Sequence, residues 1–175
     1  MFREKISRAA AVLMLAAATL CPAATFAATP LLDRAMVQNA LLGWYAGTND
    51  HKPVEQLLKY LADDVQMYYP DSPKPITGKE AFVAWYANAL VHYFDETHQI
   101  ESIDIRIEGR KATVAVVVRW ECRMWAPGDA KSSYQAFLSH QRVEFEKSAA
   151  DGRLLMTKKF VDALEKTAPL YQPES

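Results

Sequence analysis

The spacing of apolar residues changes along the chain, from three or four positions in the first part to two in the second. Helical spacing from Asp33 to about Ala46, and again from Pro53 to about Asp64, predicts two helices. A short strand, V-Q-M-Y-Y, follows between acidic residues and prolines. We then expect a long amphipathic helix with an aromatic-rich apolar face, formed by Phe82, Trp85, Tyr86, Ala89, Leu90 and Tyr93.

Beyond Thr97 the pattern predicts four antiparallel strands. The first contains alternating isoleucines and ends at the hairpin signal Gly109-Arg110, and the others span 111–125, 132–147 and 154 to about 161. Alternation also assigns the faces of these strands. One face carries Trp120, Cys122 and Met124 on the second strand and Phe137, Ser139, Gln141, Val143 and Phe145 on the third, while Arg119, Glu121 and Arg123 lie on the opposite face.

Strands of this length would each extend roughly 50 Å if they were straight. Sheets with such strands coil and bend, usually through bulges. The sequence therefore predicts an α+β fold, in which a cone-shaped curved antiparallel sheet, with one short additional strand, encloses three N-terminal helices around an internal pocket.

Residues 1–27 have the pattern of a secretory signal peptide. A basic start precedes an apolar run from 9 to 20 and a small-residue segment, and the run is too short for a bilayer core of roughly 30 Å. Cleavage after Ala27 fits best, and Ala28 fits nearly as well. We expect a periplasmic or secreted protein with one domain, 28–168, a flexible tail, 169–175, and no stable membrane span after cleavage.

The cysteines and the charge restrict the mature chain further. Cys21 leaves a lipid-anchored form open, although Leu20 directly before it fits that signal poorly. Cleavage leaves Cys122 as the single cysteine, so no internal disulfide can form. It also leaves 17 basic and 20 acidic residues, a net charge of −3, which gives no general attraction to nucleic acid.

Three stretches, VQNALLGWYAGTND, LADDVQMYYP and ITGKEAFVAWYANAL, together with the order of elements, resemble the nuclear transport factor 2-like superfamily. Within it, the chain is most similar to SnoaL-like and ketosteroid-isomerase-like domains. The resemblance implies a cone with a pocket, and a homodimer formed through the sheet face. It leaves open whether the domain is an enzyme, since this fold hosts several kinds of enzyme and also pure binding modules.

The resemblance also implies three positions for steroid isomerase chemistry, and all three differ here. The carboxylate base, the tyrosine donor and the protonated aspartate of that family fall on Tyr69, Ala40 and Gln141. Because a neutral phenol is a poor base, proton abstraction next to a carbonyl is not expected. If the domain has lyase, isomerase or cyclase activity, Tyr69 and Gln141 are weak catalytic candidates that would orient the substrate, with water or His140 moving the proton.

We expect Trp44, Tyr69, Trp85, Tyr86, Trp120 and Gln141 to line the pocket and bind a small hydrophobic molecule. The aromatic residues could instead be ordinary core. An amide among apolar neighbours needs a partner, so Gln141 either bonds Tyr69 or orients a ligand carbonyl. His140 has the opposite parity and should face outward, unless a bulge shifts the register.

The remaining histidines give little indication of chemistry. His98 is expected to be a surface or structural residue near the mouth of the cone, and His51 and His92 to be solvated. The histidines form no H-x-H or H-E-x-x-H arrangement, so we predict no metal site, and nothing indicates a cofactor. We expect Asp63 and Asp64 to be turn residues.

Two functions therefore remain open at this point. The first is an exported domain that binds a small, largely apolar molecule. The alternative is a non-catalytic association or structural module that pairs through its sheet face. Tyr69→Phe and Gln141→Ala would impair only the first function, whereas charge reversal at Glu121 or Arg123 would impair only the second.

Overall fold

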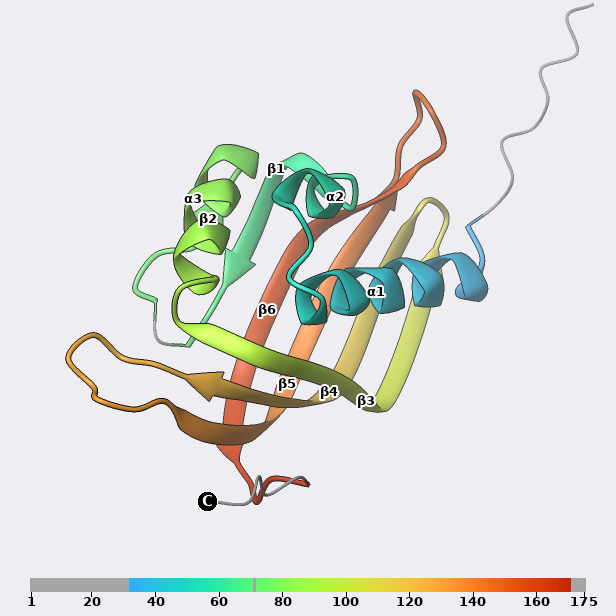
Figure 1. Cartoon of the computed structure of the whole chain (residues 1–175). Helices are drawn as coiled ribbons and strands as arrows, with labels where there is room; N and C mark the ends of the chain where they lie inside the picture. The colour runs from blue at the N-terminus through green and yellow to red at the C-terminus, as the bar shows by residue number, and fades with distance from the viewer. Residues whose placement is uncertain (1–31, 71, 171–175) are drawn as a thin grey trace, which may run out of the picture.

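A curved six-stranded sheet wraps around three helices in the computed structural model of the protein, which describes residues 32–70 and 72–170 (Figure 1). The predicted signal peptide and most of the terminal tail lie outside the described residues. The helices are α1 (Arg34–Asn49), α2 (Val54–Leu58) and α3 (Lys79–Ala89). The strands are β1 (Leu61–Tyr68), β2 (Ile76–Thr77), β3 (Tyr93–Glu108), β4 (Lys111–Met124), β5 (Ser133–Lys147) and β6 (Leu154–Lys166). The predicted α+β cone is confirmed.

The strands lie in the order β2-β1-β6-β5-β4-β3. Strands β3 to β6 form an antiparallel meander, and β1 joins its far edge parallel to β6. The predicted hairpin connects β3 to β4, and Gly109 there has a φ of 61°, a conformation that glycine adopts without strain. Figure 1 shows the helices gathered on the concave side of the sheet.

Helix α1 begins where the sequence predicts. The carboxylate of Asp33 accepts a hydrogen bond from the backbone N–H of Met36 (2.8 Å) and so caps the helix. The apolar face of α1 is buried against the sheet. Near its end, Gly47 packs so closely on α2 that an added Cβ would lie 2.6 Å from Cδ2 of Leu57. A larger residue at this position would require the buried Leu57 side chain to move.

Tertiary pairing overrides helical spacing at two boundaries. The predicted second helix ends at Leu58, and the chain from Leu61 onward is already strand, because the carbonyl of Tyr60 accepts a backbone hydrogen bond from β6 (2.7 Å). Tyr93 belongs to β3 and not to α3, because His92 accepts the backbone N–H of Trp125 (2.9 Å) and extends the β3–β4 ladder. The last strand also runs further than predicted, to Lys166.

Part of the concave space is filled with apolar side chains. Val37 and Leu41 of α1 are fully buried, as are Val114 of β4, Val143 of β5 and Met156 of β6. This core lies toward the β3–β4 hairpin. None of the helices in residues 32–70 and 72–170 is both long and apolar enough to cross a membrane.

Candidate functional site

A cavity of about 360 Å³ lies between the helices and the other half of the sheet. All the residues that the sequence analysis assigned to a ligand pocket line it: Trp44, Tyr69, Trp85, Tyr86, Trp120 and Gln141. Ala40, the third position considered for isomerase chemistry, is not among the lining residues and packs against the core. The strand alternation that predicted these positions therefore holds at this end of β4 and β5.

Aromatic rings form two facing walls of the cavity. On the helix side, Tyr69 stacks on Trp85 with ring centroids 5.1 Å apart. On the sheet side, Trp120 lies between Phe137 and Tyr93, each with its centroid 5.5 Å away. Rings on two sides present flat apolar surfaces, to which a ring-containing or chain-like molecule can stack.

Gln141 is held by protein partners inside the cone. Its Oε1 accepts a hydrogen bond from the Tyr45 hydroxyl (2.9 Å), and its Nε2 donates to Ser139 Oγ (2.8 Å). The partner is therefore Tyr45, and not Tyr69 as one alternative had it. Burial raises the pKa of Tyr45 well above the ordinary tyrosine value, and the nearby Tyr69 adds to the effect, so the phenol stays a neutral donor.

Lys159 is one polar residue of the cavity that sequence reasoning missed. It lies on β6 with 6% of its surface exposed, and its Nζ is 5.8, 5.7 and 5.9 Å from the ring centroids of Trp44, Tyr45 and Tyr69. Cation–π contacts of buried groups contribute about 2 kcal/mol, whereas removing an ammonium from water costs several kcal/mol. Burial accordingly lowers the pKa of Lys159 to about 8, although Glu96 partly offsets the shift.

A bulge explains why Lys159 faces inward. Glu144 pairs with Lys158 and the next residue of β5, Phe145, pairs with Met156, so Thr157 is left without a partner. The extra residue places both Met156 and Lys159 on the inner face. One signal was available: neighbouring residues of a strand point to opposite faces, so one of two consecutive lysines must face the helices in any register.

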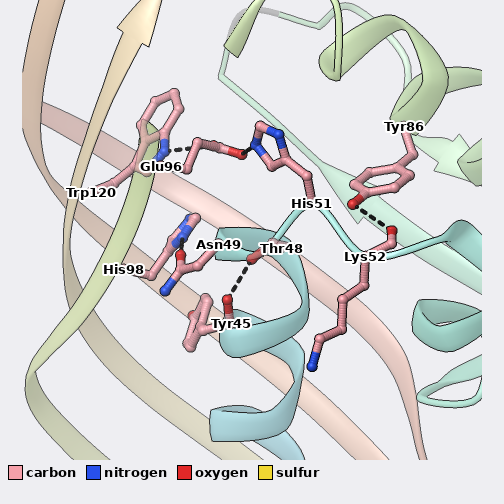
Figure 2. Close-up of polar contacts among 9 residues, drawn as sticks. All are labelled: Tyr45, Thr48, Asn49, His51, Lys52, Tyr86, Glu96, His98 and Trp120. Atoms are coloured by element: carbon pink, nitrogen blue, oxygen red, sulfur yellow. Dashed lines mark hydrogen bonds and ion pairs between the residues drawn. The ribbon is translucent and has the colours of Figure 1, made fainter. Parts of the chain in front are cut away.

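Glu96 is a second missed residue, and it connects the sheet to the end of α1 (Figure 2). Its Oε1 accepts the indole N–H of Trp120 (2.9 Å), and its Oε2 lies 3.0 Å from His51 Nε2. An irregularity in the β3–β4 pairing, where Asp95 has a φ of 52°, turns this carboxylate inward. His51, expected to be solvated, is half-buried in this contact.

His98 lies half-buried in the cavity wall, which agrees with the structural role expected for it and not with a purely surface one. Its Nδ1 lies 2.6 Å from Asn49 Oδ1, and this contact assigns the donor proton to Nδ1. Figure 2 shows the two side chains in contact. Its ring stacks on Tyr45 at 5.1 Å. Burial and the nearby Lys159 lower the pKa of His98 to about 3, so the imidazole is neutral at physiological pH.

The other candidates lie outside the cavity. His140 faces outward as its parity predicts, with Nε2 3.2 Å from Glu165 Oε1. Burial, with a smaller effect from Glu96, raises the pKa of the Cys122 thiol to about 12, which fits a buried, unreactive cysteine. Asp63 and Asp64 lie within β1, so the expectation that they are turn residues is wrong, and Asp63 pairs with Lys79 (2.7 Å). Nowhere in the described part of the chain do three or more potential metal ligands cluster.

The outer face of the sheet carries the predicted charged residues and is partly covered by the chain itself. Glu121, only 4% exposed, accepts hydrogen bonds from the Tyr134 hydroxyl (2.7 Å) and from the backbone N–H of Leu170 (2.9 Å). Arg119 donates to the carbonyl of Ala168 (3.4 Å). Residues 168–170 therefore lie against the face on which the association alternative depends.

A curved sheet closed by three helices around a hollow defines this chain as a nuclear transport factor 2-like protein. A family model described as the SnoaL-like domain matches residues 41–153, more than half of the chain. The chain belongs to this family. A comparison with curated proteins found no significant match.

Solved structures support the fold at low sequence identity. A ketosteroid isomerase-like protein from Erwinia carotovora atroseptica SCRI1043 has a TM-score of 0.60 and 18% identity, covering 77% of this chain and 96% of that one. A hexachlorocyclohexane dehydrochlorinase has a TM-score of 0.65 and 15% identity, covering 81% and 93%. A candidate scytalone dehydratase from Novosphingobium aromaticivorans DSM 12444 has a TM-score of 0.63 and 15% identity, covering 81% and 89%.

Proposed function

We propose that this SnoaL-like domain is exported and binds a small, largely apolar molecule in its cavity. The observation that carries the proposal is the cavity itself, about 360 Å³ between two aromatic walls. This volume falls within the range of roughly 300–1,000 Å³ that is typical of small-molecule sites. The N-terminal pattern of residues 1–27 supports export.

The carboxylate and the imidazole of the cavity favour recognition over proton abstraction by either of these two groups. Within the described residues, Glu96 is the only carboxylate in the cavity wall, and each of its oxygens already has a partner. The buried imidazole of His98 is too weak a base at its lowered pKa. The similar structures include a dehydrochlorinase and a candidate dehydratase, but a fold shared at such low identity does not carry an activity with it.

A cavity-filling variant tests the proposal directly. Ala89, the last residue of α3, is buried and lines the cavity, whereas Ala87 on the same helix is exposed. In Ala89→Trp the new ring should occupy the hollow and abolish binding of 2-naphthalenemethanol, measured by isothermal titration calorimetry. Ala87→Trp makes the same substitution outside the cavity and should bind like the wild type. Equal binding by both variants would place the probe elsewhere and contradict the proposal.

Native mass spectrometry of the protein purified from its own cell envelope distinguishes the two original alternatives. A co-purifying small molecule, lost in Ala89→Trp, is the expected result. A strictly paired subunit with an empty cavity would favour the association module instead. The internal hydrogen bonds of Glu121 and Arg119 give that alternative less support, because groups already engaged within one chain are less available to a second copy.

A further inference from the structure

Among the buried charged side chains in the part of the chain that the structure describes, Lys159 is the one that lines the cavity. Lys159 lies in the cavity wall with its Nζ over the faces of three aromatic rings, and a ring face supplies no hydrogen-bond acceptor oxygen. Across residues 32–70 and 72–170, its Nζ forms no hydrogen bond and no carboxylate lies within ion-pair distance of it. Its three N–H donors therefore lack an acceptor of the kind that buried ammonium groups usually have.

The neighbouring titratable groups do not supply this acceptor. Glu96 of β3 exerts an attraction on Lys159, but its oxygens are engaged with Trp120 and His51. His98, also of β3, is neutral and its Nδ1 contacts Asn49. The phenols of Tyr45 on α1 and Tyr69 after β1 present their ring faces to Nζ. The cavity thus offers an apolar surface for the body of a ligand, beside one lysine ammonium that has no hydrogen-bond acceptor among the described residues.

We propose that Lys159 binds an anionic oxygen of the ligand, so that the molecules this cavity selects are small apolar carboxylates. The inference rests on the proposed function and adds a chemical class to it. The aromatic walls would hold the apolar part, and the carboxylate would accept a charge-assisted hydrogen bond from Nζ, the stronger kind of hydrogen bond. Binding would restore a partner to the ammonium, which burial otherwise destabilises, as its pKa of about 8 indicates.

Two matched probes separate the inference from the function on which it rests. At about pH 7.5, 2-naphthoate carries a carboxylate where 2-naphthalenemethanol carries a neutral hydroxyl, and the ring systems are the same. By calorimetry on the purified protein, we expect 2-naphthoate to bind roughly tenfold to a hundredfold more tightly than the alcohol. Equal affinities, or tighter binding of the alcohol, would contradict the inference and leave the proposed function standing. Failure of both probes to bind would count against both.

Neighbouring lysines provide the variant and its control. Lys159→Met removes the ammonium but keeps a long apolar side chain, so the fold should persist and the carboxylate preference should disappear, while the alcohol binds within about threefold of its wild-type affinity. Lys158 lies on the opposite face, 3.6 Å from Glu144 Oε2, and Lys158→Met should keep the full preference. If Lys159→Met still prefers 2-naphthoate to the alcohol, the lysine does not bind the carboxylate. Its role would then be purely structural, limited to its contacts with the three rings and its attraction to Glu96.

The wild-type protein offers a test that needs no variant. Between about pH 7 and 9.5 the carboxylate of the probe stays ionised, while Lys159 loses its proton in part. The affinity for 2-naphthoate should therefore fall as the pH rises through this range, and the affinity for the alcohol should stay nearly constant. A 2-naphthoate affinity independent of pH would overturn the proposal.

Discussion

The two ends of the inner face of β4 and β5 are built from the same strands but differ in what they enclose. Toward the β3–β4 hairpin, Val114 pairs with Val143, and Ala112 pairs with Phe145. We call this end the packed half. Toward the other end, Trp120 pairs with Phe137, and the side chains line the cavity. We call this end the hollow half.

The difference lies in what the helices present to each half. The fully buried Val37 and Leu41 of α1 fill the packed half with aliphatic side chains. The hollow half instead faces large rings and polar groups, and within the described residues the indole N–H of the buried Trp44 has no hydrogen-bond partner there. Buried polar groups without partners lower stability. The unpaired indole N–H of Trp44 and the ammonium of Lys159 both line the cavity, so we infer that the packed half contributes more to the stability of the fold than the hollow half does.

The largest expected effect is a contrast between two phenylalanines of β5. Phe145 is 1% exposed in the packed half, so Phe145→Ala should lower the free energy of unfolding by about 3–5 kcal/mol, through lost burial and an unfilled cavity. Phe137 lies on the same face of the strand but already borders an open space. Phe137→Ala should therefore cost less than half as much. Urea denaturation of both variants measures the difference.

The comparison would fail if the two substitutions cost the same. Equal losses would mean that the hollow half contributes to stability as much as the packed half does, and that its rings are ordinary core. Ala89→Trp offers an independent check, because filling a genuine hollow should leave the free energy of unfolding unchanged or raise it, whereas a new ring forced into a packed core lowers it.

Strand alternation was enough to predict most of both halves. The sequence pattern of β4 and β5 placed Trp120 and Gln141 on the inner face and Arg119 on the outer face, as the structure has them. It succeeded because the pairing of β4 with β5 is regular from Lys111 to Met124. The cavity residues on the helices could also be predicted from the sequence, because helical spacing defined the apolar face of each helix.

The two charged residues of the cavity could not be placed in the same way. Glu96 and Lys159 both follow irregularities in strand pairing, at Asp95 and at Thr157. A bulge shifts the parity of every later residue, and the local sequence does not fix its position, since it depends on the pairing partner. Regular pairing defines the framework, and departures from it orient the two charged groups of the cavity.

The second prediction concerns how Lys159 changes the stability of the protein as the pH changes. Burial lowers its pKa from 10.5 to about 8, so between these values the unfolded chain binds more protons than the folded one. The contribution of Lys159 to the free energy of unfolding should therefore rise with pH in this window, by at most about 1.4 kcal/mol per pH unit. Below about pH 8 the buried ammonium carries its full penalty.

Lys159→Met removes this dependence and should be more stable than the wild type near neutral pH. The two proteins should then converge as the pH increases toward 10, when denaturation in urea is compared at matched pH values. Tyr45, whose pKa burial raises, is present in both proteins and cancels from the difference. A difference that does not change with pH would mean that the lysine is solvated in the folded state, and the charge of the hollow half would lose its significance.

The smallest effect concerns the hydrogen bond between Tyr45 and Gln141, which joins α1 to the inner face of β5. Tyr45→Phe leaves Gln141 Oε1 buried without its donor and should lower the free energy of unfolding by about 1–3 kcal/mol. Gln141→Leu alone should lower the free energy of unfolding by a similar amount, because the buried Tyr45 hydroxyl has then lost its acceptor. The double variant should cost less than the sum of the two, since both partners are then removed together. Additive losses in this cycle would show that the pair is not coupled, and that the amide is available to a ligand instead of being held by α1.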